Sequence, residues 1–78
     1  MKVQLKLFAT LRQYITENDR GICTLEVKEQ SSVSDVLEQL GVPTEIPKII
    51  LINGMQKQID DRLLDGDSLS VFPPIAGG

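Results

Sequence analysis

The sequence contains no histidine, no tryptophan and only one cysteine among 78 residues. Without histidine, the commonest general base and metal ligand is missing, and one thiol alone makes neither an internal disulfide nor a zinc site. Packing and backbone pairing therefore supply nearly all the stability, in a chain close to the lower size limit for an unaided core. We expect this chain to bind no metal and no cofactor of its own.

Positive charge and aromatic residues are also scarce. Eight Lys and Arg stand against eleven Asp and Glu, which gives a net charge of -3, and one Tyr and two Phe are the aromatic residues. Nucleic-acid binding needs a basic stripe, often with stacking aromatics, and the basic residues here are scattered. The longest aliphatic run, residues 49–52, is too short to span a bilayer, and no signal-peptide core is visible. We expect a cytoplasmic protein that binds neither nucleic acid nor membrane.

Hydrophobic residues make up 41% of the chain, which is enough for one folded domain and too much for a disordered segment. Residues 9–15 are predicted to form a short helix, because their apolar side chains then share one face. Period-2 alternation or a short apolar run predicts strands at residues 2–8, 22–28, 48–52, 56–59 and 68–72. The strand at 48–52 is expected to be buried on both faces.

The main helix is predicted to follow Ser32, which with Asp35 resembles a capping box. Gly41 and Pro43 end it, since glycine suits the left-handed position and proline cannot continue a helix. Its apolar stripe is Val33, Val36, Leu37 and Leu40, which is expected to pack on Val3, Leu5, Leu25, Val27, Leu69 and Val71. One helix covers one face of a five-stranded sheet, so the predicted fold class is a two-layer α+β domain.

Several polar and reactive residues have a structural interpretation that is favoured over a functional one. Cys23 shares strand parity with inward residues, which favours a buried thiol over a persulfide relay. Asn53-Gly54 predicts a hairpin turn. Four aspartates suggest turn chemistry or rim charges for a partner rather than a calcium loop, since no Glu closes the spacing: Asp60, Asp61, Asp65 and Asp67. Four lysines are expected on solvated faces: Lys2, Lys6, Lys28 and Lys48.

The C-terminal residues 73–78 are predicted to form an extended tail on a domain of residues 1–72. Pro73 and Pro74 hold the tail away from the sheet, and Ala76, Gly77 and Gly78 make it a narrow thread. Its distinctive reactive group is the α-carboxylate of Gly78, which is inert until it is activated, usually by adenylation with ATP. A frayed terminus is the alternative interpretation. The compact body and the two prolines favour a functional tail.

The chain resembles the ubiquitin-like β-grasp sulfur carriers, in particular the molybdopterin synthase small-subunit (MoaD) family. The resemblance runs the full length and rests on Phe8-Ala9-Thr10-Leu11-Arg12, the capped helix after Ser32, Leu64-Asp65-Gly66-Asp67, and Phe72-Pro73-Pro74-Ile75-Ala76-Gly77-Gly78. The thiamin sulfur carrier (ThiS) is a near relative with a similar Ile-Ala-Gly-Gly ending. The resemblance implies a five-stranded mixed sheet, with the first and last strands as parallel neighbours.

The resemblance also implies a mechanism and partners. An E1-like adenylyltransferase (MoeB type) would use MgATP to adenylate Gly78, and a sulfur donor protein would convert it to a thiocarboxylate. The large subunit of molybdopterin synthase (MoaE type) would then use that sulfur to build the dithiolene. The carrier brings no acid, base or metal, so whether it counts as an enzyme is left open. The alternatives are a carrier for thiamin or another thiolated product, and a protein modifier conjugated through Gly78.

A docking face is predicted around the two phenylalanines. Strand parity places Phe8 and Phe72 on the face that the helix leaves open, next to each other if the first and last strands are neighbours. Together with residues 73–76 they are the candidate partner-binding residues: Phe8, Phe72, Pro73, Pro74, Ile75 and Ala76. An exposed aromatic pair beside a reactive tail is typical of a partner-binding hot spot. The alternative is that alternation breaks at the strand ends and each Phe caps the core.

Overall fold

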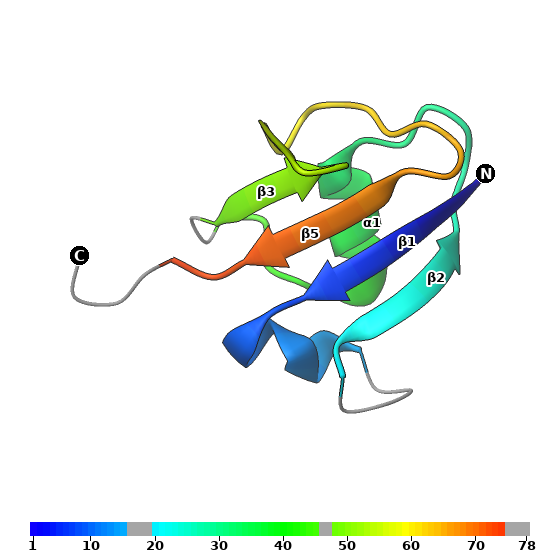
Figure 1. Ribbon diagram of the computed structural model, residues 1–78. Helices are drawn as coiled ribbons and strands as arrows, with labels where there is room; N and C mark the ends of the chain where they lie inside the picture. The colour runs from blue at the N-terminus through cyan, green and yellow to red at the C-terminus, as the bar shows by residue number, and fades with distance from the viewer. Residues whose placement is uncertain (16–19, 46–47, 75–78) are drawn as a thin grey trace.

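One sheet and one α-helix form two layers, with the helix behind the sheet in Figure 1. The computed structural model describes residues 1–15, 20–45 and 48–74. The elements, in order, are β1 (Lys2–Leu7), the 3-10 helix η1 (Ala9–Tyr14), β2 (Ile22–Glu26), α1 (Val33–Leu40), β3 (Ile49–Ile52), β4 (Met55–Lys57) and β5 (Ser68–Phe72). The strand order is β2-β1-β5-β3-β4. The predicted α+β fold, a β-grasp domain with a five-stranded mixed sheet, is confirmed.

The first and last strands meet at the centre of the sheet, as expected. β1 and β5 run parallel with Leu5 opposite Leu69 and Leu7 opposite Val71. β2 flanks β1 in an antiparallel pair, and β3 flanks β5 in the same way. Because side chains alternate along each strand, this register turns all four of those apolar residues to the helix side, where each is at most 1% exposed.

The core lies between α1 and the inner face of the sheet. Leu37 is fully buried, as predicted, and Val33 and Val36 are at most 1% exposed. Leu25 and Leu40, which were expected in the core, are half-buried and pack against its edge. Ile50 and Ile52 are buried, as expected for the strand at 48–52. The core also includes residues outside the predicted set of helix–sheet contacts: Leu11, Ile15, Val42 and Leu63. Cys23 is buried as expected.

Helix α1 has the predicted ends. The Ser32 hydroxyl accepts a hydrogen bond from the Asp35 N–H at 3.1 Å, and the Asp35 carboxylate accepts one from the Ser32 N–H at 3.0 Å. Gly41 closes the helix in the left-handed region with φ 82°. Hydrogen bonds from Ser32, its backbone N–H first and its side chain second, hold the pKa of Asp35 below its usual range, with a smaller contribution from Arg62.

Replacing Ser32 by alanine is expected to destabilise the domain by about 1 kcal/mol, because one N–H of the first helical turn then loses its acceptor. The cost is measured by urea unfolding, with Ser34→Ala as the control that leaves the Ser32–Asp35 pair intact. Because the pKa of Asp35 is depressed in the fold, its contribution exists above the pKa of an unfolded aspartate, about 4. It is lost as the pH falls through the lower folded value, so the difference between the two variants should narrow in acid, while the part due to the missing hydroxyl acceptor remains. Equal stability of both at neutral pH would contradict this role.

Several element boundaries differ from the predictions. Residues 9–14 form a 3-10 helix, and β2 ends at Glu26 although the alternation continues to residue 28. The weak strand expected at 56–59 is β4, Met55–Lys57. Because the next backbone N–H, that of Gln58, donates to the Asp61 carboxylate at 2.7 Å, the chain turns there. Alternation in the sequence indicates where a strand can form, but a local turn determines where the strand ends.

Lys48 and two of the aspartates make specific hydrogen bonds to the main chain. Lys48, expected on a solvated face, is half-buried, and its Nζ donates to the Pro43 carbonyl at 2.9 Å; burial lowers its pKa, against the opposing effect of Glu45. The carboxylate of Asp67 accepts the Leu64 N–H at 2.8 Å and so acts as a turn acceptor, whereas Asp65 accepts the Lys2 N–H at 2.7 Å and ties its loop to the start of β1. Within residues 1–15, 20–45 and 48–74, no group of His, Cys, Asp or Glu is arranged to hold a metal ion. No helix in this part of the chain is long and apolar enough to cross a membrane.

Candidate functional site

The two phenylalanines lie side by side where β1 and β5 end. Leu7 is opposite Val71 in the parallel pair, and the ladder continues with a hydrogen bond from the Phe8 N–H to the Val71 carbonyl at 3.1 Å. The rings of Phe8 and Phe72 stack, with centroids 4.2 Å apart and planes 9° from parallel. Phe8 is 36% exposed and Phe72 is half-buried. The expected proximity of the two rings is therefore present, on the face opposite α1.

The aromatic pair continues into an apolar surface along the same face. Ile49 of β3 pairs with Phe72, and Leu51 pairs with Ser70. On the other side Ile22 of β2 pairs with Lys6. Residues directly opposite each other share a face, so one end of the open face is apolar. We call this the open-face patch; it comprises Phe8, Phe72, Ile22, Ile49 and Leu51.

The open-face patch corrects one expectation. The apolar run at residues 48–52 was predicted to be buried on both faces, but Ile49 is 37% exposed and Leu51 is half-buried. Ile50 and Ile52 are the residues of β3 that belong to the core, so the other side of β3 stays open. Ile22 is also 39% exposed. Sequence reasoning missed these three patch residues, because their position next to the phenylalanines depends on strand order.

A hollow adjoins the patch where the chain leaves β5. It has a volume of about 500 Å³ and lies between η1 and the first two residues of the tail. Ala9 begins η1 in the left-handed region with φ 53°, which turns the chain sharply after Phe8. The hollow is lined by Ala9, Thr10, Leu11, Gln13, Tyr14, Pro73 and Pro74. A partner in contact with the patch would therefore also reach the root of the tail.

The tail leaves the sheet directly after the patch. Pro73 is half-buried and Pro74 is exposed, and Figure 1 shows residues 73–74 leaving the end of β5. Residues 75–78, which include the predicted reactive Gly78 and Gly77 and the candidate contacts Ile75 and Ala76, lie outside the described residues. Their expected chemistry and partner contacts stay predictions. Among the patch residues and their neighbours Lys6 and Ser70, the charged side chain is that of Lys6. This surface is therefore suited to contact with a partner rather than to acid–base catalysis.

A β-grasp domain with an exposed apolar sheet end, from which a Gly-Gly tail departs, has the architecture of ubiquitin-like modifiers and sulfur carriers. The chain belongs to the Mut7-C ubiquitin family, whose model matches residues 1–76. It is 27% identical over 99 aligned residues to Small archaeal modifier protein 3 of Haloferax volcanii, with 100% of both chains covered. The resemblance to ubiquitin-like carriers is thus confirmed at the level of the family.

Solved structures share the fold. The crystal structure of SAMP1 from Haloferax volcanii matches with a TM-score of 0.75 and 23% identity over 100% of both chains. The putative molybdopterin converting factor, subunit 1, from Pyrococcus furiosus matches with a TM-score of 0.73 and 27% identity, over 96% of this chain and 99% of that one. A complex of subunits 1 and 2 of the molybdopterin-converting factor from Helicobacter pylori matches with a TM-score of 0.61 and 22% identity over 100% of both chains. The last of these was solved as a complex with subunit 2 of the same factor.

Proposed function

We propose that this chain is a sulfur carrier that is activated at Gly78 and donates sulfur for molybdopterin synthesis as the small subunit of the synthase. The observation that carries the proposal is the position of the tail: Pro73 follows Phe72 directly, so the tail starts at the edge of the open-face patch. A partner docked on that patch holds the root of the tail in a fixed place. The C-terminal carboxylate is thereby presented to the active site of the partner.

The chemistry belongs to the tail and the partners together. The Gly78 carboxylate attacks the α-phosphorus of ATP, pyrophosphate leaves, and an acyl-adenylate forms. A persulfide of the donor protein then displaces AMP to form an acyl disulfide, and a second thiol of the donor cleaves its S–S bond, which leaves the thiocarboxylate on Gly78 and a disulfide on the donor. An E1-like adenylyltransferase supplies MgATP and the acid–base groups, because the carrier brings only the carboxylate and the contact surface. Ala76 and Gly77 keep the thread narrow enough to enter a channel.

Two observations favour the molybdopterin pathway among the carrier functions. The Phe72-Pro73-Pro74 brace carries the resemblance to the small subunit of molybdopterin synthase, whereas the Ile-Ala-Gly-Gly ending is shared with thiamin carriers. The similar Pyrococcus furiosus protein is described as a putative molybdopterin converting factor subunit, and the Helicobacter pylori protein was solved with its second subunit. We therefore expect the large synthase subunit to dock on the open-face patch.

The proposal is tested by reconstitution with purified partners. With the cognate E1-like adenylyltransferase and MgATP, the protein should support ATP–pyrophosphate exchange. Addition of the sulfur donor should then raise the intact mass by the difference between sulfur and oxygen. Mixed with the large synthase subunit and the pterin precursor, the thiocarboxylate form should yield molybdopterin and return to the carboxylate. Absence of exchange would contradict activation, and exchange without molybdopterin would contradict the pathway.

A protein modifier is the second candidate function, because the curated relative is named a small archaeal modifier protein. In that case the activated Gly78 would acylate lysine side chains of target proteins. Tagged protein expressed in its native cells should then give a ladder of adducts that resists thiol reduction and disappears when Gly78 is deleted. A thiocarboxylate without such a ladder would favour the carrier. Both functions begin with adenylation, so only the fate of the acyl group separates them.

Truncation of Phe72 to alanine is expected to weaken binding to the activating enzyme or the large subunit by about 2 kcal/mol or more, since a stacked, half-exposed ring at the centre of a patch is a typical hot spot. Binding is measured by calorimetry. The control is Leu64→Ala, which removes a 72% exposed side chain on the loop that leads into β5. Phe72→Ala should change thermal stability little. A large stability loss with unchanged affinity would show that Phe72 acts as a core residue.

A further inference from the structure

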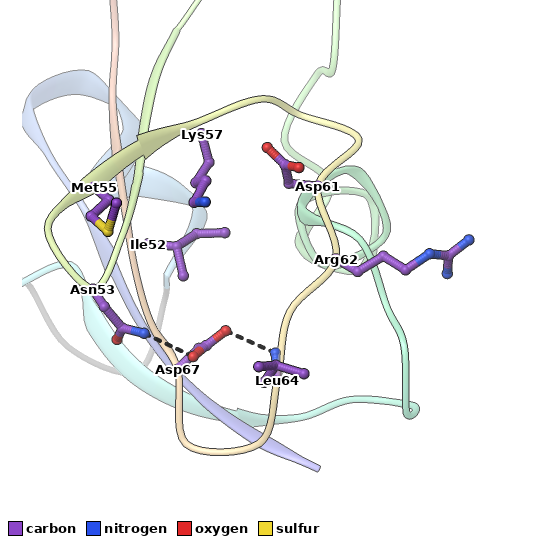
Figure 2. A pocket seen from close by; sticks show the side chains of 8 residues that line it. All are labelled: Ile52, Asn53, Met55, Lys57, Asp61, Arg62, Leu64 and Asp67. Atoms are coloured by element: carbon purple, nitrogen blue, oxygen red, sulfur yellow. Dashed lines mark hydrogen bonds between the residues drawn. The ribbon is translucent and has the colours of Figure 1, made fainter.

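The two-residue turn between β3 and β4 is fastened to the start of β5. Asn53 and Gly54 both have positive φ, 52° and 83°, as a type I′ turn requires, and Ile52 pairs with Met55 across it. The Asn53 Nδ2 donates to Asp67 Oδ1 at 2.9 Å, and the Ser68 N–H donates to Asn53 Oδ1 at 3.0 Å. Both ends of the side-chain amide are therefore held, and Figure 2 shows the bond from Asn53 to Asp67.

Asp67 is fixed in this contact by further bonds. It is 9% exposed, and its second carboxylate oxygen accepts the Leu64 N–H at 2.8 Å, as the second dashed line in Figure 2 shows. The Asn53 N–H donates to the Ser68 carbonyl at 2.8 Å, so main chain and side chain both tie the turn to β5. We call this set of bonds among Asn53, Asp67 and Ser68 the clasp.

We propose that Asn53 is a site of spontaneous deamidation, which the clasp holds latent in the folded protein. The glycine after Asn53 has no Cβ to obstruct attack on the side-chain amide by its own backbone nitrogen. In that step the Gly54 N bonds to Asn53 Cγ, the Gly54 N–H proton is lost, and the bond from Cγ to Nδ2 breaks with release of ammonia. Water then opens the cyclic imide at either carbonyl to give aspartate or isoaspartate. The net change is water consumed and ammonia released, with no oxidant or reductant.

The clasp opposes this step by geometry. The amide must rotate toward the Gly54 nitrogen, and that rotation breaks the bonds to both Asp67 and Ser68. The reaction then proceeds only from molecules in which the hairpin has opened locally. Water access is not limiting, because Asn53 is exposed and borders an open hollow of about 260 Å³. Opening of the clasp is therefore the step that controls the rate.

The product would not fit the clasp. An aspartate at position 53 places a carboxylate oxygen where Nδ2 now donates to Asp67, so two carboxylates face each other at hydrogen-bond distance. Lys57 points into the same hollow, but Ile52 lies between it and the clasp in Figure 2. The guanidinium of Arg62 donates to the Gln30 carbonyl and points away, and Asp61 adds a further negative charge at the rim. The modified turn is therefore expected to detach from β5.

The rate of the reaction is measured on the tryptic peptide 49–57, which contains Asn53 between Lys48 and Lys57. Folded wild-type protein in mildly alkaline buffer should convert at least about tenfold more slowly than the same protein unfolded in guanidinium. Asp67→Asn, which weakens the clasp, should convert several-fold faster than folded wild type. Asp61→Asn, on the rim of the same hollow, is the matched control and should not change the rate. Equal rates in folded and unfolded protein would overturn the proposal, and so would slower conversion in Asp67→Asn, since Asp67 would then assist the reaction.

The effect of the product is measured with Asn53→Asp and Asn53→Gly, which both remove the amide while only the first adds a carboxylate. At about pH 7 the melting temperature of Asn53→Asp should lie roughly 5–10 °C below that of Asn53→Gly. The difference should close by about pH 3, because acid neutralises the carboxyl group that the substitution introduces at position 53. A variant Asn53→Asp that folds only in acid supports the proposal. Equal melting temperatures at neutral pH, or failure of Asn53→Asp to fold at either pH while Asn53→Gly folds, would overturn the charge conflict.

Discussion

A chain extended by one or more residues beyond Gly78 is expected to lose activation completely. The extension replaces the α-carboxylate, the group proposed to attack ATP, with a peptide bond. ATP–pyrophosphate exchange with the cognate E1-like enzyme measures the effect. The folded domain should be unaffected, because residues 73–78 follow the last strand and the core ends at Val71.

The matched control for this prediction is the same sample after the extension is removed. A protease site that ends in Gly78 would restore the free carboxylate, and activation should return with it. Gly77→Ala keeps the carboxylate and adds one methyl group, so it should reduce the rate of activation without abolishing it. Normal exchange by a chain with its extension still attached would exclude Gly78 as the activated group.

Replacement of Leu37 by alanine is expected to cost about 2–5 kcal/mol of the free energy of unfolding. The Leu37 side chain is fully buried on the side of α1 that faces the sheet, and its truncation leaves a cavity there. A small domain has a total stability of about 5–15 kcal/mol, so the loss is a large fraction of the whole. Urea unfolding at neutral pH measures it.

Two comparisons make the Leu37 prediction specific. Leu40→Ala removes the same atoms from a half-buried position of the same helix and should cost clearly less. Leu64→Ala, at a 72% exposed position, should cost almost nothing. If the three variants lost similar amounts of stability, the helix would not be packed as the structure has it.

The features that sequence predicted well act over short range. The ends of α1 are defined by hydrogen bonds of Ser32, Asp35 and Gly41 to residues at most four positions away. Such local bonds can be predicted from the sequence. The hairpin at Asn53-Gly54 is equally local. The central pairing of the first and last strands is a long-range feature, and it was available only through the family resemblance.

The features that sequence missed depend on contacts between distant segments. Ile49 and Leu51 belong to a run with no alternation, and their exposed side became clear only from the pairing of β3 with β5. Asp67 looked like one of four turn aspartates, but its bond to Asn53 spans 14 positions. For the candidate site the sequence is more informative than the structure. Gly77 and Gly78 lie outside the described residues, so the proposed reactive end of the tail rests on the sequence alone.

The place of β5 between β1 and β3 has a consequence for the folding kinetics. Without β5, the sheet order β2-β1-β5-β3-β4 divides into two separate hairpins. β5 joins them through pairs such as Leu5 with Leu69, which lie 64 positions apart in the chain. Such contacts give a high contact order, so nucleation has to overcome the entropy of closing nearly the whole chain into a loop. During synthesis one edge of β1 stays unpaired until the last strand has been translated, which leaves that edge open to incorrect pairing in the meantime.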